Sequence, residues 1–330
     1  RAVSAGTAED DGPPKSGGRV DAIDCARGVA LIGMALYHLS WDLADFQLVP
    51  PMLPFSPPMR LFSHAVACTF LALVGVSLAL AQRNRLNLPA FLRRLAIVAA
   101  AAALVTVGSL IFAPGEGIWF GILHCIVAAS VLALPFIEAP AFASLLVGAA
   151  AIVIPFFVHS PLFDPPALLW IGLGKALPNT LDWYPLLPWA GVVLIGLGLS
   201  LLPGVLGRIA SPKRWRASSG PARAVCFAGR HSLAFYLGHQ LILFPLVWTA
   251  AASGLFPPVP PPKPDYGAFL AACERACVAG GRTADDCETS CRCVADVVER
   301  SGEAERLGAD ALDARRKAEL KQMAEACMAR

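Results

Sequence analysis

Two pairs of ionisable side chains interrupt an otherwise apolar segment, residues 24–46, and are the first residues in the sequence that could do chemistry. Asp24 and Arg27 lie three residues apart and His38 and Asp42 four apart, so each pair shares one face of a helix. Because a charge inside an apolar span is costly, such residues usually serve function. The 14 residues from Asp24 to His38 correspond to about 21 Å of helix, which places the pairs near opposite ends.

His38 is the strongest candidate for a catalytic base. The carboxylate of Asp42, four residues on, is placed to orient the ring and to support its basicity near neutral pH. His124 is predicted at a similar depth in a later apolar segment. For His64 and His239 we favour the commoner role of a lone helical histidine, a hydrogen-bonded packing residue. A metal held by several histidines is an alternative, but no zinc-ligand spacing such as H-E-x-x-H is present, so we expect no metal.

Four arginines near predicted helix ends could bind a phosphate-bearing ligand through charge-assisted hydrogen bonds. They are Arg27, Arg93, Arg94 and Arg230. The alternative is that they only supply the excess of Lys and Arg that membrane proteins carry on their cytoplasmic side. No P-loop, dinucleotide-binding glycine pattern or nucleophile elbow accompanies them.

The composition identifies the elements that must position these residues. Hydrophobic residues make up 56% of the 330 and charged residues 15%, whereas about 25% are charged in a typical soluble domain. Seven segments of roughly 20 mostly apolar residues are each suited to crossing a hydrocarbon core of about 30 Å. They are 24–46, 60–82, 91–112, 117–136, 139–158, 186–206 and 225–252. We therefore predict an all-α membrane bundle of about seven transmembrane helices, embedded in a lipid bilayer.

Basic residues in the short connections predict the orientation. The connection after the second segment carries Arg83, Arg85, Arg93 and Arg94 without an acid, and the connection after the sixth is also basic. By the positive-inside rule both face the cytoplasm, which places the N-terminus inside and, with seven spans, the C-terminus outside. We expect the inner membrane of a bacterium. The net charge of +3 comes without the concentrated basic face that would indicate a nucleic acid partner.

The end of the chain differs from the rest, because residues 263–330 hold 11 basic and 13 acidic residues. We divide the chain into a disordered cytoplasmic N-terminal tail (1–18), a transmembrane domain (19–254), a Pro-rich linker (255–264) and an extracytoplasmic, cysteine-rich helical tail (265–330). Six of the ten cysteines lie in this tail.

The cysteine spacing of the tail predicts a disulfide-bonded helical hairpin. Two pairs of cysteines are each four residues apart, on one face of a helix, and Gly280 and Gly281 separate the pairs. Nested bridges would pair Cys273 with Cys291 and Cys277 with Cys287, leaving Cys293 and Cys327 for a third. An oxidising compartment favours bridges. A zinc site is the alternative, although metal-binding pairs more often have two-residue spacing, and sequence alone does not fix the connectivity.

Several motifs, in order along the chain, resemble a known family. They are Asp24-Cys25-Ala26-Arg27-Gly28, Tyr37-His38, the segment from Phe70 to Ser77, Gly121 to His124, Leu187-Pro188-Trp189, Gly229 to Leu233, and Tyr236 to His239. Over residues 19–252 the sequence is similar to the heparan-alpha-glucosaminide N-acetyltransferase catalytic-domain family, in its bacterial branch. The cysteine-rich tail lies outside the resemblance.

The resemblance implies an integral membrane acyltransferase. Acetyl-CoA or another acyl-CoA would be used from the cytosolic side, and the acyl group would pass to a sugar or glycan outside. The expected donor-binding residues are Asp24, Arg27, Arg93, Arg94, Arg230 and His231, and the expected catalytic residues are His38, Asp42 and His124. Lysosomal members have Asn at the position of His38, and residues 47–59 contain no histidine to carry an acyl group. Direct transfer is therefore favoured over an acyl-histidine intermediate.

Two other functions fit an apolar body with a polar tail. A transporter or flippase would line a path with polar residues in both leaflets, but would be expected to show repeated or inverted halves, which are not visible. A membrane anchor for the cysteine-rich tail would need neither His38 nor Arg27. The Gly- and Ala-rich stretches 96–104 and 191–200 permit close helix packing, either within one bundle or in a homodimer.

Overall fold

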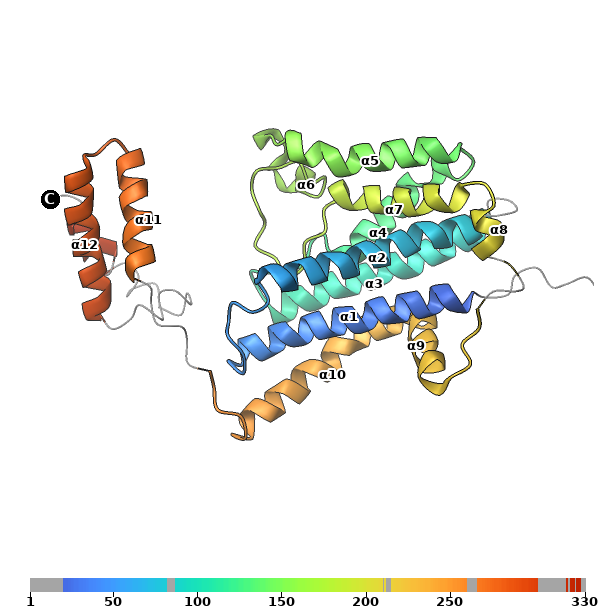
Figure 1. Cartoon of the computed structure of the whole chain (residues 1–330), viewed down its shortest axis with the longest axis horizontal. Helices are drawn as coiled ribbons and strands as arrows, with labels where there is room; N and C mark the ends of the chain where they lie inside the picture. The colour runs from blue at the N-terminus through green and yellow to red at the C-terminus, as the bar shows by residue number, and fades with distance from the viewer. Residues whose placement is uncertain are drawn as a thin grey trace, which may run out of the picture. The chain divides into compact units, whose positions relative to one another are not determined.

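The computed structural model describes residues 20–81, 87–209, 211, 215–259, 266–301, 319, 321–323 and 325–327. All regular structure in this part of the chain is helical, as predicted (Figure 1). The chain divides into two compact units, of which one contains the apolar helices and the other the cysteine-rich helices. The predicted N-terminal tail (1–18) and half of the predicted linker, residues 260–264, lie outside the described residues.

The apolar unit begins with three long helices, α1 (Asp21–Asp45), α2 (Pro57–Ala81) and α3 (Leu88–Phe112). Three shorter apolar helices follow, α4 (Ile122–Leu132), α5 (Ala141–Phe157) and α7 (Leu186–Leu201). The short helices α6 (Pro166–Leu169) and α8 (Val205–Ile209) flank α7, and the unit closes with α9 (Gly220–Arg230) and α10 (Ser232–Ala252).

In the part of the chain that the structure describes, four helices are long and apolar enough to cross a membrane: α1, α2, α3 and α10. The other three predicted spans form shorter helices, and α4 has only 11 residues, about 17 Å at 1.5 Å per residue. The predicted span 117–136 is shortened at both ends, because the helix begins after Gly121 and Pro135 falls in the 3₁₀ turn Leu134–Phe136.

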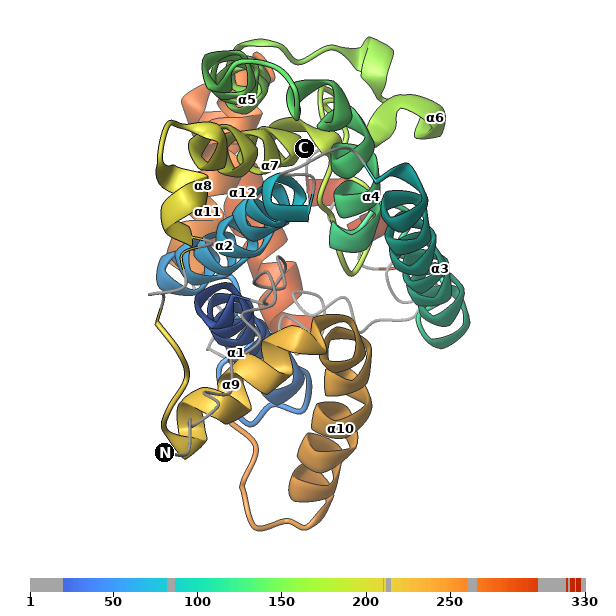
Figure 2. The same cartoon turned by 90° about the vertical axis from the view of Figure 1, so that its right-hand side faces the viewer.

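The prediction of one continuous span over 225–252 is wrong. α9 ends at Arg230, α10 begins at Ser232, and the two helices point in different directions (Figures 1 and 2). Contact with α1 explains the break, because α9 lies backbone to backbone against it. A Cβ atom on Gly229 would lie 1.7 Å from the carbonyl oxygen of Asp24, and one on Gly28 would lie 2.1 Å from that of Val225.

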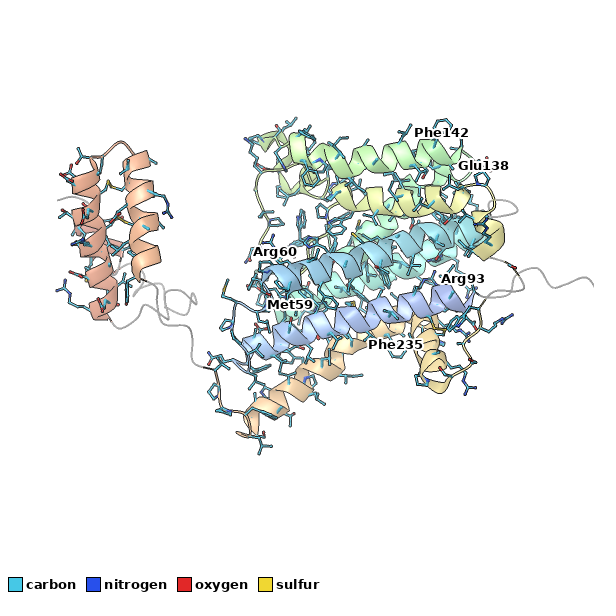
Figure 3. All side chains as sticks on the ribbon, viewed as in Figure 1. Met59, Arg60, Arg93, Glu138, Phe142 and Phe235 are labelled. Atoms are coloured by element: carbon cyan, nitrogen blue, oxygen red, sulfur yellow. A yellow bond between two sulfur atoms is a disulfide. The ribbon has the colours of Figure 1, made fainter. Side chains whose placement is uncertain are left out.

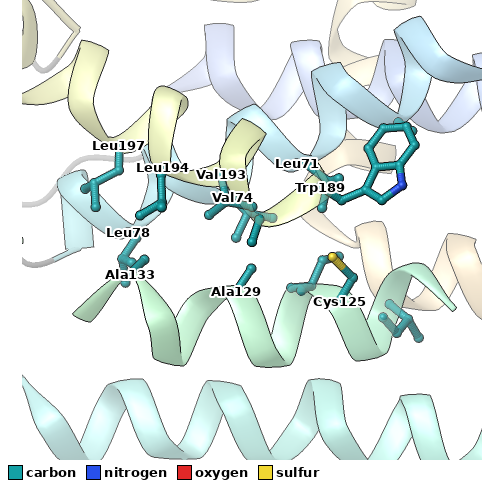
Figure 4. Packing of buried hydrophobic residues seen from close by; sticks show 14 of the residues in the cluster. Leu71, Val74, Leu78, Cys125, Ala129, Ala133, Trp189, Val193, Leu194 and Leu197 are labelled. Atoms are coloured by element: carbon teal, nitrogen blue, oxygen red, sulfur yellow. The ribbon is translucent and has the colours of Figure 1, made fainter. Parts of the chain in front are cut away.

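α7 is the central helix of the core (Figure 4). Its glycines permit close approach: a Cβ atom on Gly196 would lie 2.2 Å from the carbonyl oxygen of Ala72 in α2, and one on Gly191 would lie 2.5 Å from that of Gly148 in α5. Ser144 of α5 is fully buried and donates to the carbonyl oxygen of Leu194 at 2.7 Å. The small-residue stretch 191–200 therefore packs within this bundle.

The second unit contains the hairpin of α11 (Tyr266–Ala279) and α12 (Ala284–Ser301). Gly281 turns the chain between them with a positive φ of 90°. The predicted nested bridges Cys273–Cys291 and Cys277–Cys287 are present, with Cα–Cα distances of 5.9 and 5.7 Å. The third bridge, Cys293–Cys327, also follows the prediction.

Candidate active site

The first residues of α1 and the last residue of α9 form an ion-pair cluster of Asp21, Asp24, Arg27 and Arg230. Arg230 contacts both carboxylates, Asp21 at 2.9 Å and Asp24 at 3.2 Å. Arg27 pairs with Asp24 at 3.5 Å, as the sequence predicted, and donates to the hydroxyl of Ser77 in α2. Both carboxylates are buried. Since two acids face two guanidinium groups, the cluster is close to neutral.

Local packing holds this cluster together. Asp21 also accepts a hydrogen bond from the backbone N–H of Ala217 at 3.2 Å, just before α9. One turn along, Cys25 and Cys226 form a disulfide between α1 and α9. Neither the role of Asp21 nor this bridge is evident from the sequence, because the partners are about 200 residues away in the chain.

The other residues expected to bind a donor come from α3 and from the break after α9. Arg93 and Arg94 belong to α3, and among the described residues neither has an ion-pair partner. Figure 3 shows Arg93 at the end of the bundle where α1 begins, with Arg60 at the opposite end. Arg94 lines a cavity of about 30 Å³ between α2, α3 and α4, whose walls are apolar apart from Ser130. His231, at the break between α9 and α10, is exposed and donates from Nδ1 to the carbonyl oxygen of Phe227 at 3.0 Å.

Towards the other end of α1, a histidine cluster is formed by His38 and Asp42 of α1 with His239 and Gln240 of α10. The rings of His38 and His239 meet edge to face, with centroids 4.9 Å apart. The Asp42 carboxylate accepts a hydrogen bond from the Gln240 amide at 3.0 Å. Among the described residues no hydrogen bond joins Asp42 to His38, because the carboxylate turns towards α10. The predicted pairing of these two residues is therefore wrong.

The histidine cluster contains three buried polar atoms without a partner among the described residues. They are Asp42 Oδ2, His239 Nε2 and Gln240 Oε1. His239 Nδ1 lies 2.6 Å from the carbonyl oxygen of Tyr236, so Nδ1 carries the proton and Nε2 of the neutral ring is an acceptor. A buried polar atom left unpaired costs about 1–3 kcal/mol. All three atoms are acceptors, so the cluster is suited to bind a group with N–H or O–H donors.

His38 is the member of this cluster with the most freedom to react. It makes no hydrogen bond to any described residue, and its ring is only partly covered. A neutral histidine in this state can take a proton from a group that binds beside it.

His124 has a structural role at the start of α4. Its Nδ1 accepts from the backbone N–H of Gly121 at 3.3 Å, which closes a capping box. Its Nε2 lies 3.3 Å from the hydroxyl of Thr106, which itself donates to the carbonyl oxygen of Ile118. Nε2 must therefore be the donor. Both ring nitrogens are occupied, and among the described residues no hydrogen bond or ring contact joins His124 to His38.

The remaining histidines also have simple partners. His64 donates from Nδ1 to the carbonyl oxygen of Arg60 at 2.6 Å, and its ring stacks on that of Trp189 with centroids 5.7 Å apart. His159 is exposed and bonds the carbonyl oxygen of Gly174 at 3.3 Å. The described part of the chain contains no group of three or more His, Cys, Asp or Glu side chains that could hold a metal ion.

Comparison with known protein families shows which family the chain belongs to. The family model for heparan-alpha-glucosaminide N-acetyltransferase, catalytic, matches residues 19–241. The chain belongs to this family. No curated protein and no solved structure matched it.

The part of the chain that matches the heparan-alpha-glucosaminide N-acetyltransferase family includes both the ion-pair cluster and the histidine cluster. It ends before the cysteine-rich tail. Family membership implies an activity like that of a transmembrane acetyltransferase. The structure also explains parts of the motifs that carry the likeness, because Gly28 and Gly229 are the glycines at which α1 and α9 touch.

Some residues of the two clusters and their surroundings are not evident from the sequence alone. The sequence favours a packing role for His239 and gives no signal for Gln240. Asp182, in the segment before α7, was also missed, although it is one of two acids in the predicted outer segment 159–185. Its partner is a backbone N–H at the start of α4, and no sequence pattern marks that contact.

Proposed function

We propose that this chain is a membrane acyltransferase that moves an acyl group from acyl-CoA to an amine or hydroxyl of a sugar or glycan on the other side of the membrane. The observation that carries the proposal is that α1 presents the ion-pair cluster at one end and the histidine cluster towards the other. About 21 Å of helix separates Asp24 from His38. A transfer across a bilayer needs functional groups at both ends of the path.

In this proposal, His38 is the general base at the acceptor end. The acceptor's N–H or O–H group would bind beside the unpaired oxygens of Asp42 and Gln240. As the acceptor attacks the thioester carbon, its proton passes to His38 and the C–S bond breaks to release CoA as a thiolate. His239 packs against His38 and keeps the ring in place. His124, with both nitrogens occupied, shapes the wall of the site through α4.

The donor end would bind the negatively charged phosphates of CoA. Arg93, Arg94 and His231 supply positive or polar groups there that are not held in ion pairs among the described residues. Arg27 and Arg230 already face carboxylates, so they organise the donor end and add less attraction for phosphate. A cavity of about 30 Å³ beside Arg94 holds about two water molecules, so the helices around it must separate for a donor to enter.

The orientation is part of the proposal. The excess of arginines near the start of α1 supports a cytoplasmic donor end, by the positive-inside rule. The three disulfides of the tail support an oxidising compartment on the other side, as in a bacterial inner membrane facing the periplasm, whereas the Cys25–Cys226 bridge at the donor end speaks against a reducing cytosol there.

A transfer assay tests the proposed function. The full chain, purified in detergent, is incubated with acetyl-CoA labelled in the acetyl group and with a panel of glycans that carry free amines and hydroxyls. We expect labelled acetyl-CoA to bind and the label to appear on at least one glycan. If neither binding nor transfer is found, a transporter or an anchor for the tail becomes the better account.

A further inference from the structure

Asp182 joins the segment before α7 to the start of α4. Its Oδ2 accepts the backbone N–H of Ile122, the first residue of α4, at 3.0 Å. Gly121 allows this approach, because a Cβ atom there would lie 2.3 Å from the same oxygen. The first backbone N–H groups of a helix have no partner within the helix, and a carboxylate is their strongest acceptor.

The neighbours of Asp182 make the same connection through uncharged groups. The backbone N–H of Leu181 donates to the backbone carbonyl oxygen of Glu116 at 3.0 Å, and that of Tyr184 donates to the backbone carbonyl oxygen of Phe120 at 3.2 Å. The hydroxyl of Thr180 donates to the carbonyl oxygen of Gly117 at 3.0 Å. Residues 180–184 are thus attached along the segment that leads into α4, and Asp182 supplies the charged contact.

The same carboxylate faces the histidine cluster through one side chain. Tyr236 of α10 is close enough to Asp182 to interact with it electrostatically. The ring of Tyr236 lies 6.0 Å from that of His239, centroid to centroid. Tyr236 therefore neighbours both Asp182 and His239, and Asp182 itself is not a member of the histidine cluster.

The surroundings of Asp182 make its charge sensitive to mild acid. The protein around it excludes water and raises the pKa of its carboxyl to about 6, while the Ile122 N–H opposes that rise. The other titratable groups that face it are Tyr184 of its own segment, Tyr236 of α10 and Cys125 of α4. Burial and the nearby Asp182 also raise the pKa of Tyr184 above its usual range. The tyrosines and the thiol are neutral at pH 7 and below.

We propose that Asp182 is a positioning residue for acyl transfer. Its ionised carboxylate holds residues 180–184 on the start of α4 and thereby fixes the position of Tyr236. Tyr236 forms part of the wall against which the acceptor binds, beside His239. This inference rests on the proposed function and names a determinant of acceptor binding that lies outside the histidine cluster. The sign of the pH effect follows from the contact. Protonation replaces a charge-assisted hydrogen bond to Ile122 by a weaker one, so the wall loosens as the pH falls through about 6.

The variant Asp182→Asn tests the proposal, because Asn keeps the size and one acceptor oxygen for the Ile122 N–H but cannot ionise. In the wild type we expect the KM for the acceptor to rise by about tenfold between pH 7 and pH 5, with a smaller change in the KM for acetyl-CoA. In Asp182→Asn the acceptor KM should already be raised at pH 7 and should no longer depend on pH in this range. Asp164→Asn is the matched control, since Asp164 lies in the same outer segment and binds only the backbone N–H groups of Lys175 and Ala176 among the described residues.

A second measurement reports on Asp182 without any transfer reaction. Infrared difference spectra of the full chain in detergent, taken between pH 7 and pH 5, should contain the C=O band of a carboxyl group that protonates near pH 6. The band should be absent from Asp182→Asn and present in Asp164→Asn. If the wild type transfers no acyl group but shows the band, the proposed function fails and the positioning role fails with it. If transfer occurs but Asp182→Asn keeps the wild-type KM and its pH dependence, Asp182 does not position the acceptor, and the proposed function stands without this inference.

Discussion

At the residue scale, the candidate site depends on a few polar side chains whose partners come from distant parts of the chain. The sequence pointed to His38 and Asp42 because charged and titratable residues are rare in the apolar segments. It did not identify the partner of Asp42, since Gln240 is 198 residues away and glutamine in a helix carries no pattern of its own. Because distant partners are not visible in the sequence, the sequence favours a packing role for His239 and does not indicate the capping role of His124.

Replacement of His38 by alanine should lower acyl transfer by at least about 100-fold, because a general base typically contributes 10²–10⁴ to the rate. Binding of acetyl-CoA should be unchanged, since His38 is at the other end of α1 from the ion-pair cluster. The measurement is label transfer in detergent together with equilibrium binding of acetyl-CoA. His159→Ala is the control, because His159 is exposed and outside the cluster. Retained activity in His38→Ala would remove the residue from catalysis.

Replacement of Gln240 by alanine should destabilise the apolar unit by about 1–3 kcal/mol. The change leaves the buried Asp42 carboxylate without its hydrogen-bond donor. The free energy can be measured from denaturant unfolding in detergent, followed by circular dichroism. Thr249→Ala removes a hydroxyl from an exposed position of the same helix and should have little effect. Equal stability of the two variants would show that the contact between Asp42 and Gln240 contributes nothing to the fold.

At the scale of elements, apolar length was a good guide to the helices and a poor guide to where they end. Every predicted span contains a helix, yet α4 is short because Gly121 and Pro135 bound it. The break at His231 could not be predicted from hydrophobicity, because it arises from the backbone contact of α9 with α1. The tail hairpin was predicted correctly, since the cysteine spacing and two glycines carry local information on helix faces and the turn.

Gly229→Ala should disturb the junction of α1 and α9. The added methyl group would lie 1.7 Å from the carbonyl oxygen of Asp24, so the helices must separate, at a cost of about 1–3 kcal/mol. We expect a lower unfolding midpoint and a larger fraction of free thiol at Cys25 and Cys226, measured by alkylation and mass spectrometry. Gly238→Ala is the matched control, because a Cβ atom there meets nothing within 4 Å. If both variants behave like the wild type, the close contact between α1 and α9 is not required.

At the scale of the whole molecule, the apolar helices and the cysteine-rich helices form two separate compact units. The family match covers most of the apolar unit and stops at residue 241, within α10, while three disulfides stabilise the tail. The high hydrophobic content of the sequence comes from the apolar unit, whereas many of the charged residues and most of the cysteines lie in the tail.

Removal of the Cys273–Cys291 bridge by a double change to serine should destabilise the tail by about 2–4 kcal/mol. Limited proteolysis of the full chain should then cut the tail faster, with little change in acyl transfer. Cys68→Ser serves as the control, because Cys68 is a free cysteine of the apolar unit. Loss of transfer together with loss of the bridge would show that the tail takes part in the reaction.

The most direct test of the central claim is transfer across a membrane. The full chain is reconstituted into sealed liposomes that enclose labelled acetyl-CoA, and a membrane-impermeant amino-sugar oligosaccharide is added outside. We predict that label accumulates on the external oligosaccharide with the wild type and not with His38→Ala. Transfer that occurs only when donor and acceptor are on the same side, or no transfer at all, would contradict the account.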